Sequence, residues 1–262
     1  MDLGLSDRVV AITGAGAGIG LEIARAYLAE GARVVGADLD PSGLHALGDA
    51  SRVLVLELDL RTPDGGHRLA QAALERFGRI DVLVNNAGAA AVREGFLGVT
   101  DAQWQATLEL NLMGYVRATR AVLPHMLKRG SGSLIHVASE AGRMPNPRLP
   151  DYSVSKAAVL MLSKVLSLEL TPKGIRSNAI LPGFIRTPIY DRPGGLADAL
   201  AAEYGLEREP ALERFVAESG IPAGRLGTPQ EVAAIAVFLA SDAAAFVSGA
   251  NVAADGGVTP VV

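Results

Sequence analysis

The sequence of 262 residues contains no cysteine. This absence excludes disulfide bonds, thiolate metal sites and a cysteine nucleophile. No apolar run approaches the roughly 18 to 20 residues that span a bilayer. The N-terminal segment lacks the basic and then apolar pattern of a secretory signal. We therefore expect a cytoplasmic protein that does not enter a membrane.

Excess positive charge is also missing. The chain has 24 Lys and Arg residues against 28 Asp and Glu residues, a net charge of -4. Such a balance argues against a nucleic-acid partner and against an anionic membrane surface. Four histidines, His45, His67, His125 and His136, share no ligand spacing, so we predict no metal site. With 49% hydrophobic and 20% charged residues, the composition favours a large buried core over disorder.

Short β-branched runs alternate with helical patterns along the chain. The runs are Arg8–Thr13, Ala32–Asp38, Val53–Asp59, Ile80–Asn85, Ser133–Ser139, Arg176–Leu181 and Ala250–Ala254. The helical patterns are Gly18–Glu30, about Thr62–Phe77, Asp101–Arg129, Asp151–Leu170 and Pro229–Ser241. This alternation predicts an α/β fold with a doubly wound, Rossmann-type, mostly parallel sheet of seven strands, covered by helices on both faces.

One long irregular stretch, Pro182–Thr228, interrupts the alternation. Two segments inside it, Leu196–Tyr204 and Ala211–Glu218, have helical patterns. Long irregular segments in compact domains are often active-site lids. We therefore predict a single domain, 1–262, with a substrate-lid insertion at about 183–227.

The first strand runs directly into a glycine-rich turn, TGAGAGIG, which opens an apolar-periodic helix. Glycines there allow a dinucleotide pyrophosphate to approach the backbone and to bind at a helix N-terminus. The spacing is T-G-x-x-x-G-x-G, through Gly14, Gly18 and Gly20, rather than the commoner G-x-G-x-x-G. Its position after the first strand favours a binding loop over a merely flexible turn.

Asp38 ends the second strand, about 20 residues past the glycine turn. A carboxylate there can accept hydrogen bonds from the adenosine ribose hydroxyls, and it repels a 2′-phosphate. No Lys or Arg occurs among Ala15, Gly16 and Ala17 to bind such a phosphate. The sequence therefore predicts NAD(H) in preference to NADP(H).

Tyr152 and Lys156 are four residues apart in a helical pattern, so they share one helix face. A free tyrosine, with a pKa near 10, is a poor base, but a neighbouring cation favours the phenolate. Lys156 and an oxidised nicotinamide would both supply positive charge. Ser139, at the end of the fifth strand, could donate a hydrogen bond to the reacting oxygen, or it could simply cap a turn. The group predicts proton exchange with an alcohol or a carbonyl.

Taken together, these motifs resemble the short-chain dehydrogenase/reductase family over essentially the whole chain. The matching pieces are TGAGAGIG, Asp38, Asp59-Leu60, NNAG at 85–88, Asn111, Ser139, Tyr152–Lys156, Pro182-Gly183, Thr187 and the closing DGG. The family's fifth-strand motif often has two adjacent serines, and Ala138 replaces the first of them here. Glu140, directly after Ser139, is less usual and could face the substrate.

The resemblance implies a role for each matching residue. Asn111, Ser139, Tyr152 and Lys156 would be catalytic, with Tyr152 as general acid and base and Asn111 in a water-mediated proton relay with Lys156. The cofactor would contact Gly14, Gly18, Ile19, Gly20, Asp38, Asp59, Leu60, Asn86, Ala87, Gly88, Tyr152, Lys156, Pro182, Gly183, Ile185 and Thr187. Asp59 would contact adenine, and Ile185 and Thr187 would hold the nicotinamide carboxamide.

The leading hypothesis is an NAD(H)-dependent oxidoreductase that interconverts a secondary alcohol and a ketone. A non-catalytic dinucleotide sensor on the same fold is the alternative. Enoyl reductases space their Tyr and Lys more widely, and sugar epimerases usually carry a longer C-terminal domain. Family members pair through their long helices, so we also expect a homo-oligomer, a tetramer. Neither the substrate nor the direction of the reaction can be predicted from the sequence.

Overall fold

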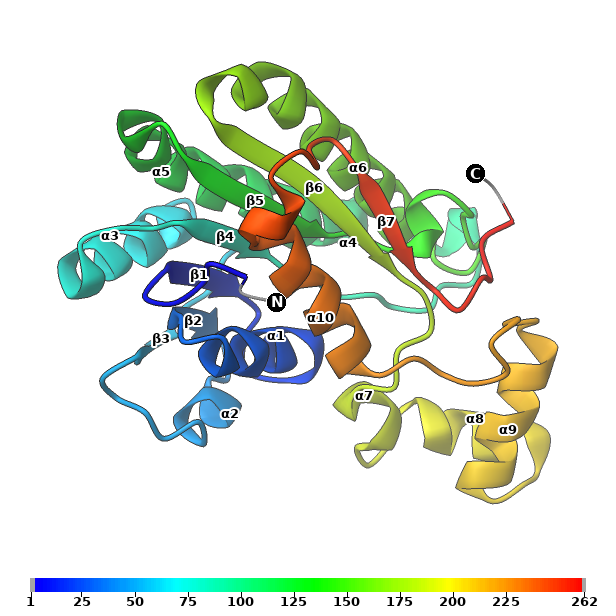
Figure 1. The fold of residues 1–262 in the computed structure, drawn as a ribbon. Helices are drawn as coiled ribbons and strands as arrows, with labels where there is room; N and C mark the ends of the chain where they lie inside the picture. The colour runs from blue at the N-terminus through cyan, green and yellow to red at the C-terminus, as the bar shows by residue number, and fades with distance from the viewer. Residues whose placement is uncertain (1–2, 261–262) are drawn as a thin grey trace.

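A computed structural model describes residues 3–260 of the chain. Its centre is one sheet of seven parallel strands in the order β3-β2-β1-β4-β5-β6-β7 (Figure 1). The strands are β1 (Val9–Thr13), β2 (Arg33–Asp38), β3 (Val53–Glu57), β4 (Val82–Asn85), β5 (Gly132–Val137), β6 (Ile175–Pro182) and β7 (Asn251–Ala254). The order changes direction between β1 and β4, which is the place where doubly wound sheets bind ligands. The predicted fold class is confirmed.

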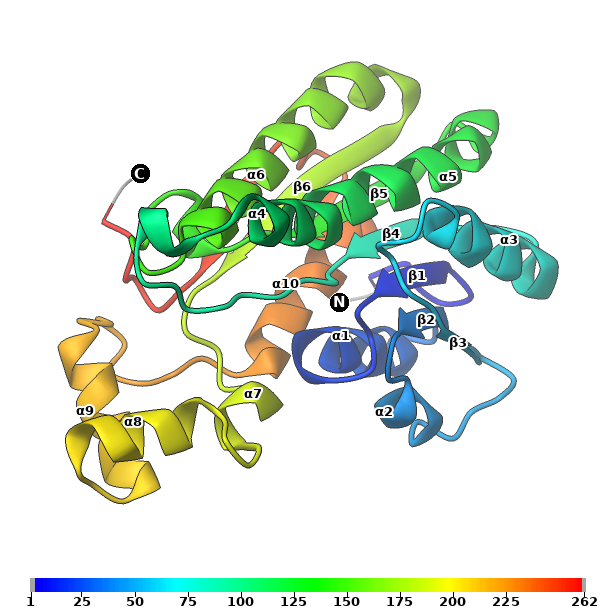
Figure 2. The same cartoon turned by 180° about the vertical axis from the view of Figure 1, so that it is seen from behind.

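Helices cover both faces of the sheet, as Figures 1 and 2 show from opposite sides. One face carries α1 (Gly18–Ala29) and α10 (Pro229–Ala240), with the short α2 (Ser42–His45) beside β2. The other face carries α3 (Gly65–Phe77), α4 (Asp101–Leu108), α5 (Gly114–Arg129) and α6 (Pro150–Leu170). Within residues 3–260, no helix combines the length and apolarity required to cross a bilayer.

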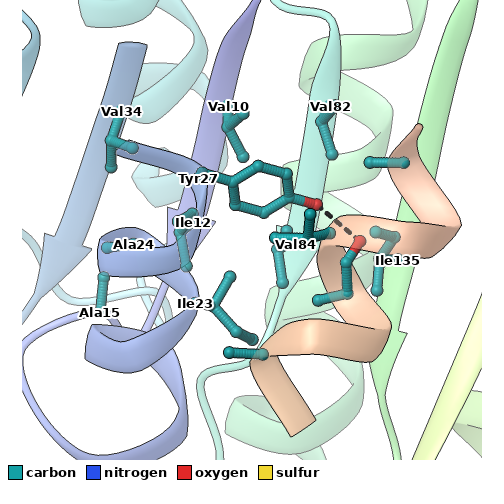
Figure 3. Close-up of a cluster of buried hydrophobic side chains, with 14 of the residues drawn as sticks. Val10, Ile12, Ala15, Ile23, Ala24, Tyr27, Val34, Val82, Val84 and Ile135 are labelled. Carbon is teal, nitrogen blue, oxygen red and sulfur yellow. Dashed lines mark hydrogen bonds between the residues drawn. The ribbon is translucent and has the colours of Figure 1, made fainter. Parts of the chain in front are cut away.

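Each layer of helices closes a separate apolar core against the sheet. Under α1 and α10, the strand side chains Val10, Ile12 and Val84 pack against Ile23 and Tyr27 (Figure 3). The Tyr27 hydroxyl is fully buried and donates to the Ala236 carbonyl of α10 at 2.8 Å. This bond satisfies the one polar atom of the ring, since a buried hydroxyl without a partner would destabilise the fold.

The predicted helix Asp101–Arg129 is interrupted. A π-helical turn, η2 (Glu109–Met113), separates α4 from α5. π-turns are rare and often occur at functional sites. Two strands also end earlier than expected: β3 ends at Glu57, so Asp59 lies in the following loop, and β5 ends at Val137, so Ser139 follows the strand.

The segment between β6 and α10 forms a small helical layer of its own. It contains α7 (Pro188–Asp191), α8 (Leu196–Tyr204) and α9 (Arg208–Glu218), which lie beside the main body in Figure 1. The two helices predicted here, Leu196–Tyr204 and Ala211–Glu218, are present, and the second begins three residues earlier. Tyr190 and Leu200 are part of this layer's own buried cluster.

Candidate active site

The glycine turn after β1 has no room for larger residues. Gly14 has a φ of 65°, and a Cβ there would lie 2.7 Å from the Cα of Ala87. A Cβ on Gly20 would lie 2.0 Å from the Gly14 carbonyl oxygen. Gly18, with a φ of 55°, would bring a Cβ to 3.4 Å from the side chain of Thr187. The turn thus needs glycine both for its backbone shape and for its close contacts.

Side chains from the β4 loop hold this turn in place. The Asn86 side-chain amide donates to the carbonyls of Thr13, at 3.1 Å, and Gly14, at 2.8 Å. In return, the Thr13 hydroxyl accepts from the backbone N–H groups of Asn86 and Ala87. Neither the role of Thr13 nor this reciprocal bonding was predicted from the sequence.

Helix α1 begins at Gly18 without a side-chain cap, and its first turn has no acidic residue. Its leading N–H groups are therefore not occupied by a capping side chain. Free N–H groups and the helix dipole together favour a phosphate group. Ile19, in this first turn, packs against the core beneath α1. The turn and the helix end fit the pyrophosphate of a dinucleotide.

Asp38 ends β2 beside the glycine turn. Its carboxylate accepts from the N–H groups of Gly16, at 2.8 Å, and Asp40, at 3.1 Å. These bonds hold a negative charge next to the turn. The next residue, Leu39, is 56% exposed and supplies no cation.

Asp59 and Leu60 lie in the loop after β3, at the same carboxyl end of the parallel strands as Asp38. Leu60 is buried. The Asp59 carboxylate forms a bidentate ion pair with Arg61, whose hydrogen bonds lower the pKa of Asp59. Arg61 is a partner of the predicted adenine site that the sequence argument did not include.

Ser139 begins the short helix η3 (Glu140–Gly142) at the end of β5. Its Oγ accepts from the Ala141 N–H at 3.1 Å and donates to Glu140 Oε2 at 2.6 Å. The hydroxyl of Ser139 also favours the phenolate of Tyr152. Both predicted roles of Ser139, turn cap and site residue, are therefore compatible with the geometry.

Tyr152 and Lys156 lie in the first turns of α6 and face the end of β5. The Lys156 Nζ lies 5.7 Å from the centre of the Tyr152 ring and donates to the Val137 carbonyl at 2.8 Å. Burial lowers the pKa of Lys156 to about 7 and raises that of Tyr152 to about 12. From the sequence we expected a lowered tyrosine pKa. In the protein without cofactor, the effect of burial on Tyr152 outweighs that of its contact with Ser139.

The π-turn places Asn111 in the interior, where it joins two elements. Its side chain donates to the Ala89 carbonyl and to Ser155 Oγ, and it accepts from the Ala89 N–H, at 3.0 to 3.1 Å. Both amide hydrogens are used, whereas Oδ1 retains a second acceptor position for the water of the predicted relay. A Cβ on Gly88 would lie 3.3 Å from both Asn111 Oδ1 and Lys156 Nζ, so the three residues adjoin one another.

The remaining predicted cofactor residues follow β6. Pro182 ends the strand, and a Cβ on Gly183 would lie 2.9 Å from Asp255. Ile185 is buried and forms a β-bridge with Gly227. Thr187 begins α7 and lies against Gly18. The segment therefore reaches from the sheet edge to the glycine turn.

Sequence reasoning missed Tyr115, which is fully buried beside Lys156. Its hydroxyl donates to the Val137 carbonyl at 3.0 Å and lies 3.5 Å from Lys156 Nζ. Lys156 also lies 5.4 Å from the centre of the Tyr115 ring. No motif marks Tyr115, although its position four residues after Asn111 places the two on one side of the helix.

Three features define a Rossmann-type oxidoreductase. They are a helix that begins in a glycine turn, an acidic residue at the end of β2, and a Ser–Tyr–Lys group at the carboxyl end of β5. The chain belongs to the short-chain dehydrogenase/reductase family. A family model described as enoyl-(acyl carrier protein) reductase matches residues 14–259. The relatives and neighbouring structures found include dehydrogenases and reductases, two of them in structures complexed with NADPH or NADH.

Three of these comparisons cover nearly the full chain. A 3-oxoacyl-[acyl-carrier-protein] reductase of Thermotoga maritima is 35% identical over 97% of this chain and 98% of its own. D-threitol dehydrogenase of Mycolicibacterium smegmatis is 37% identical over 98% and 95%. The structure of L-sorbose reductase from Gluconobacter frateurii, complexed with NADPH and L-sorbose, is 35% identical over 100% of both chains, with a TM-score of 0.93.

Proposed function

We propose that this protein is an NAD(H)-dependent dehydrogenase that interconverts a secondary alcohol and a ketone. The observation that carries the proposal is the meeting of Ser139, Tyr152 and Lys156 at the carboxyl end of β5. The segment after β6 connects this edge to the glycine turn through Thr187. A dinucleotide in that turn can therefore extend towards the tyrosine.

The bound nicotinamide would supply or accept the hydride. In ketone reduction, the Tyr152 hydroxyl gives its proton to the carbonyl oxygen, and in alcohol oxidation it takes the proton back. A pKa of about 12 keeps the hydroxyl protonated at neutral pH, which suits reduction. Lys156 would bind the nicotinamide ribose and, when charged, favour the phenolate that oxidation requires. Ser139 would orient the reacting oxygen.

The preference for NAD(H) rests on Asp38. Its carboxylate is held beside the glycine turn by two backbone N–H groups, and the exposed residue after it is Leu39. A 2′-phosphate at this place would meet a negative charge with no cation to balance it. The names of the relatives include D-threitol, L-sorbose and an acyl carrier protein, and substrates this different do not select one for this chain.

The test is a screen of ketones for oxidation of NADH and of NADPH by the native protein and by Tyr152→Phe. We expect turnover with at least one ketone, faster with NADH. The phenylalanine variant should lose about 100- to 10,000-fold in kcat because it has no proton to transfer. It should still bind NADH, as measured by quenching of protein fluorescence.

Oxidation by the native protein should also accelerate with rising pH, since the phenolate fraction increases about tenfold per pH unit below its pKa. Cofactor binding without turnover of any ketone or alcohol would instead indicate a dinucleotide sensor. Undiminished turnover by Tyr152→Phe would remove Tyr152 from the mechanism.

A further inference from the structure

Glu140 is a half-buried carboxylate that the proposed reaction does not use. It follows Ser139 directly and is the first residue of η3. Its charge acts on Tyr152 of α6 and on Tyr190 of α7, so it faces the space between the catalytic tyrosine and the helical layer. Burial raises the pKa of Glu140, whereas the Ser139 hydroxyl and two backbone amides lower it.

The hydrogen bond between Ser139 and Glu140 has a consequence for the reaction. Ser139 has one hydroxyl proton, and at 2.6 Å it donates that proton to Glu140 Oε2. Its oxygen already accepts from the Ala141 N–H. While this proton points to Glu140, it is not available to the reacting oxygen of a substrate or to Tyr152, which the same hydroxyl also reaches. When Ser139 donates to a substrate instead, Glu140 Oε2 loses this hydrogen bond unless another donor replaces it.

Apart from Ser139, the backbone N–H groups of Ala141 and of Glu140 itself also stabilise the carboxylate. No Lys, Arg or His pairs with Glu140 within residues 3–260. Asp255, the other carboxylate nearby, accepts from the N–H groups of Gly257 and Thr259, at 3.0 and 3.1 Å. Both carboxylates accept hydrogen bonds from backbone N–H groups, but Glu140 is the one that adjoins Ser139.

We propose that the substrate carries a second hydroxyl on the carbon next to the reacting carbinol, and that this hydroxyl donates to Glu140. The Ser139 proton is then released to the reacting oxygen. The substrate class is accordingly a vicinal diol or polyol, or the matching α-hydroxyketone. This inference rests on the proposed function and adds Glu140 to it as a specificity-determining residue.

The test compares two substrates that differ by one hydroxyl, 2,3-butanediol and 2-butanol, with NAD+ at pH 8. For the native protein we expect kcat/KM to favour the diol by about 10- to 100-fold, the value of a hydrogen bond to a charged group. Glu140→Gln should reduce this ratio by about tenfold or more, because a glutamine amide can donate to Ser139 without the diol. Glu140→Ala should reduce it as well.

Glu30→Gln, at the exposed C-terminal end of α1, is the matched control and should keep the native ratio. Equal kcat/KM values for both alcohols in the native protein, or an unchanged ratio in both Glu140 variants, would overturn the inference and leave the dehydrogenase intact.

Binding separates the two proposals. Calorimetry in the presence of NADH measures the affinity of native protein and Glu140→Gln for the diol and the monoalcohol without turnover. Preferential diol binding that Glu140→Gln loses supports the inference even if no alcohol is oxidised, in which case the proposed function alone fails. Equal affinity of the native protein for the diol and the monoalcohol would mean that Glu140 does not recognise the second hydroxyl.

Discussion

Lys156 combines a charged side chain with complete burial, and this has a measurable effect on stability. Burial lowers its pKa from 10.5 to about 7. Between these values the unfolded chain binds a proton that the folded protein lacks, so stability rises with pH in that window. Relative to Lys156→Met, the native protein without added cofactor should gain about 2.5 kcal/mol in free energy of unfolding between about pH 6.5 and pH 9.

Urea denaturation of both proteins at each pH measures this difference. All other titrating groups are shared, so they cancel in the comparison, including His136, whose pKa burial lowers to about 4. Parallel stability curves for the two proteins would mean that Lys156 titrates as an ordinary lysine. The hydrogen bond from Lys156 to the Val137 carbonyl would then compensate for the hydration that the ammonium loses on burial.

Sequence spacing predicts which face of a helix a residue occupies, but not the direction of its side chain. The spacing of Tyr152 and Lys156 predicts that they share one face of a helix, and both lie on α6 where it faces the end of β5. It could not show that the Lys156 ammonium turns to the Val137 carbonyl, because that choice depends on Tyr115 from another helix. Likewise, only the structure reveals that the Ser139 hydroxyl donates a hydrogen bond to Glu140.

At the scale of elements, one buried ion pair joins the loop after β4 to the start of α6. Arg93 Nη2 lies 2.7 Å from Asp151 Oδ2, and their side chains are 15% and 1% exposed. Thr107 of α4 donates to the same oxygen at 2.8 Å. These bonds keep the pKa of Asp151 below its usual value despite burial. Because Asp151 precedes Tyr152, the pair also fixes the catalytic end of the helix.

Asp151→Asn should lower the free energy of unfolding by about 3 kcal/mol, because it leaves a buried guanidinium without its counter-charge. The corresponding fall in Tm is about 6 to 12 °C for a chain of this size. Glu169→Gln, which breaks an exposed pair between the end of α6 and Lys173 in the turn that follows it, is the control and should cost less than about 1 kcal/mol. Equal effects of the two substitutions would show that Arg93 is well solvated.

The break between α4 and α5 could not be predicted from hydrophobic period. Apolar residues continue through Asp101–Arg129, so the pattern predicts one helix. The π-turn at Glu109–Met113 inserts Asn111 between Ala89 and Ser155, and three hydrogen bonds from its side chain form only in the folded protein. The hydrogen bonds of the Asn111 side chain to other parts of the fold thus coincide with a departure from the regular α-helix that the sequence predicts.

For the whole molecule, the alternation of strands and helices was sufficient to predict the sheet. Parallel strands require right-handed crossovers, which leave few possible strand orders. The segment between β6 and α10, which we predicted to be a lid, differs in this respect. Its prolines and glycines predict irregular chain, but they do not encode the ion pairs of Arg186 with Asp191 and Glu209 that connect α7 to α9.

The outer face of α6 argues for assembly of the chain into oligomers. Val154, Met161, Val165 and Leu168 follow one stripe of the helix and are 51 to 70% exposed. Contiguous apolar surface of this kind commonly marks an interface. The family resemblance implies a homotetramer, so we predict a light-scattering mass about four times the 27.1 kDa of one chain.

Met161→Glu combined with Val165→Glu should reduce that mass, because each interface with two-fold symmetry would bury the new charges twice. The paired change Glu169→Lys and Lys173→Glu, at the end of α6 and in the turn after it, keeps the net charge and leaves the stripe intact, so it should preserve the native mass. A native protein that remains monomeric at micromolar concentration would leave the exposed stripe of α6 without an oligomeric role.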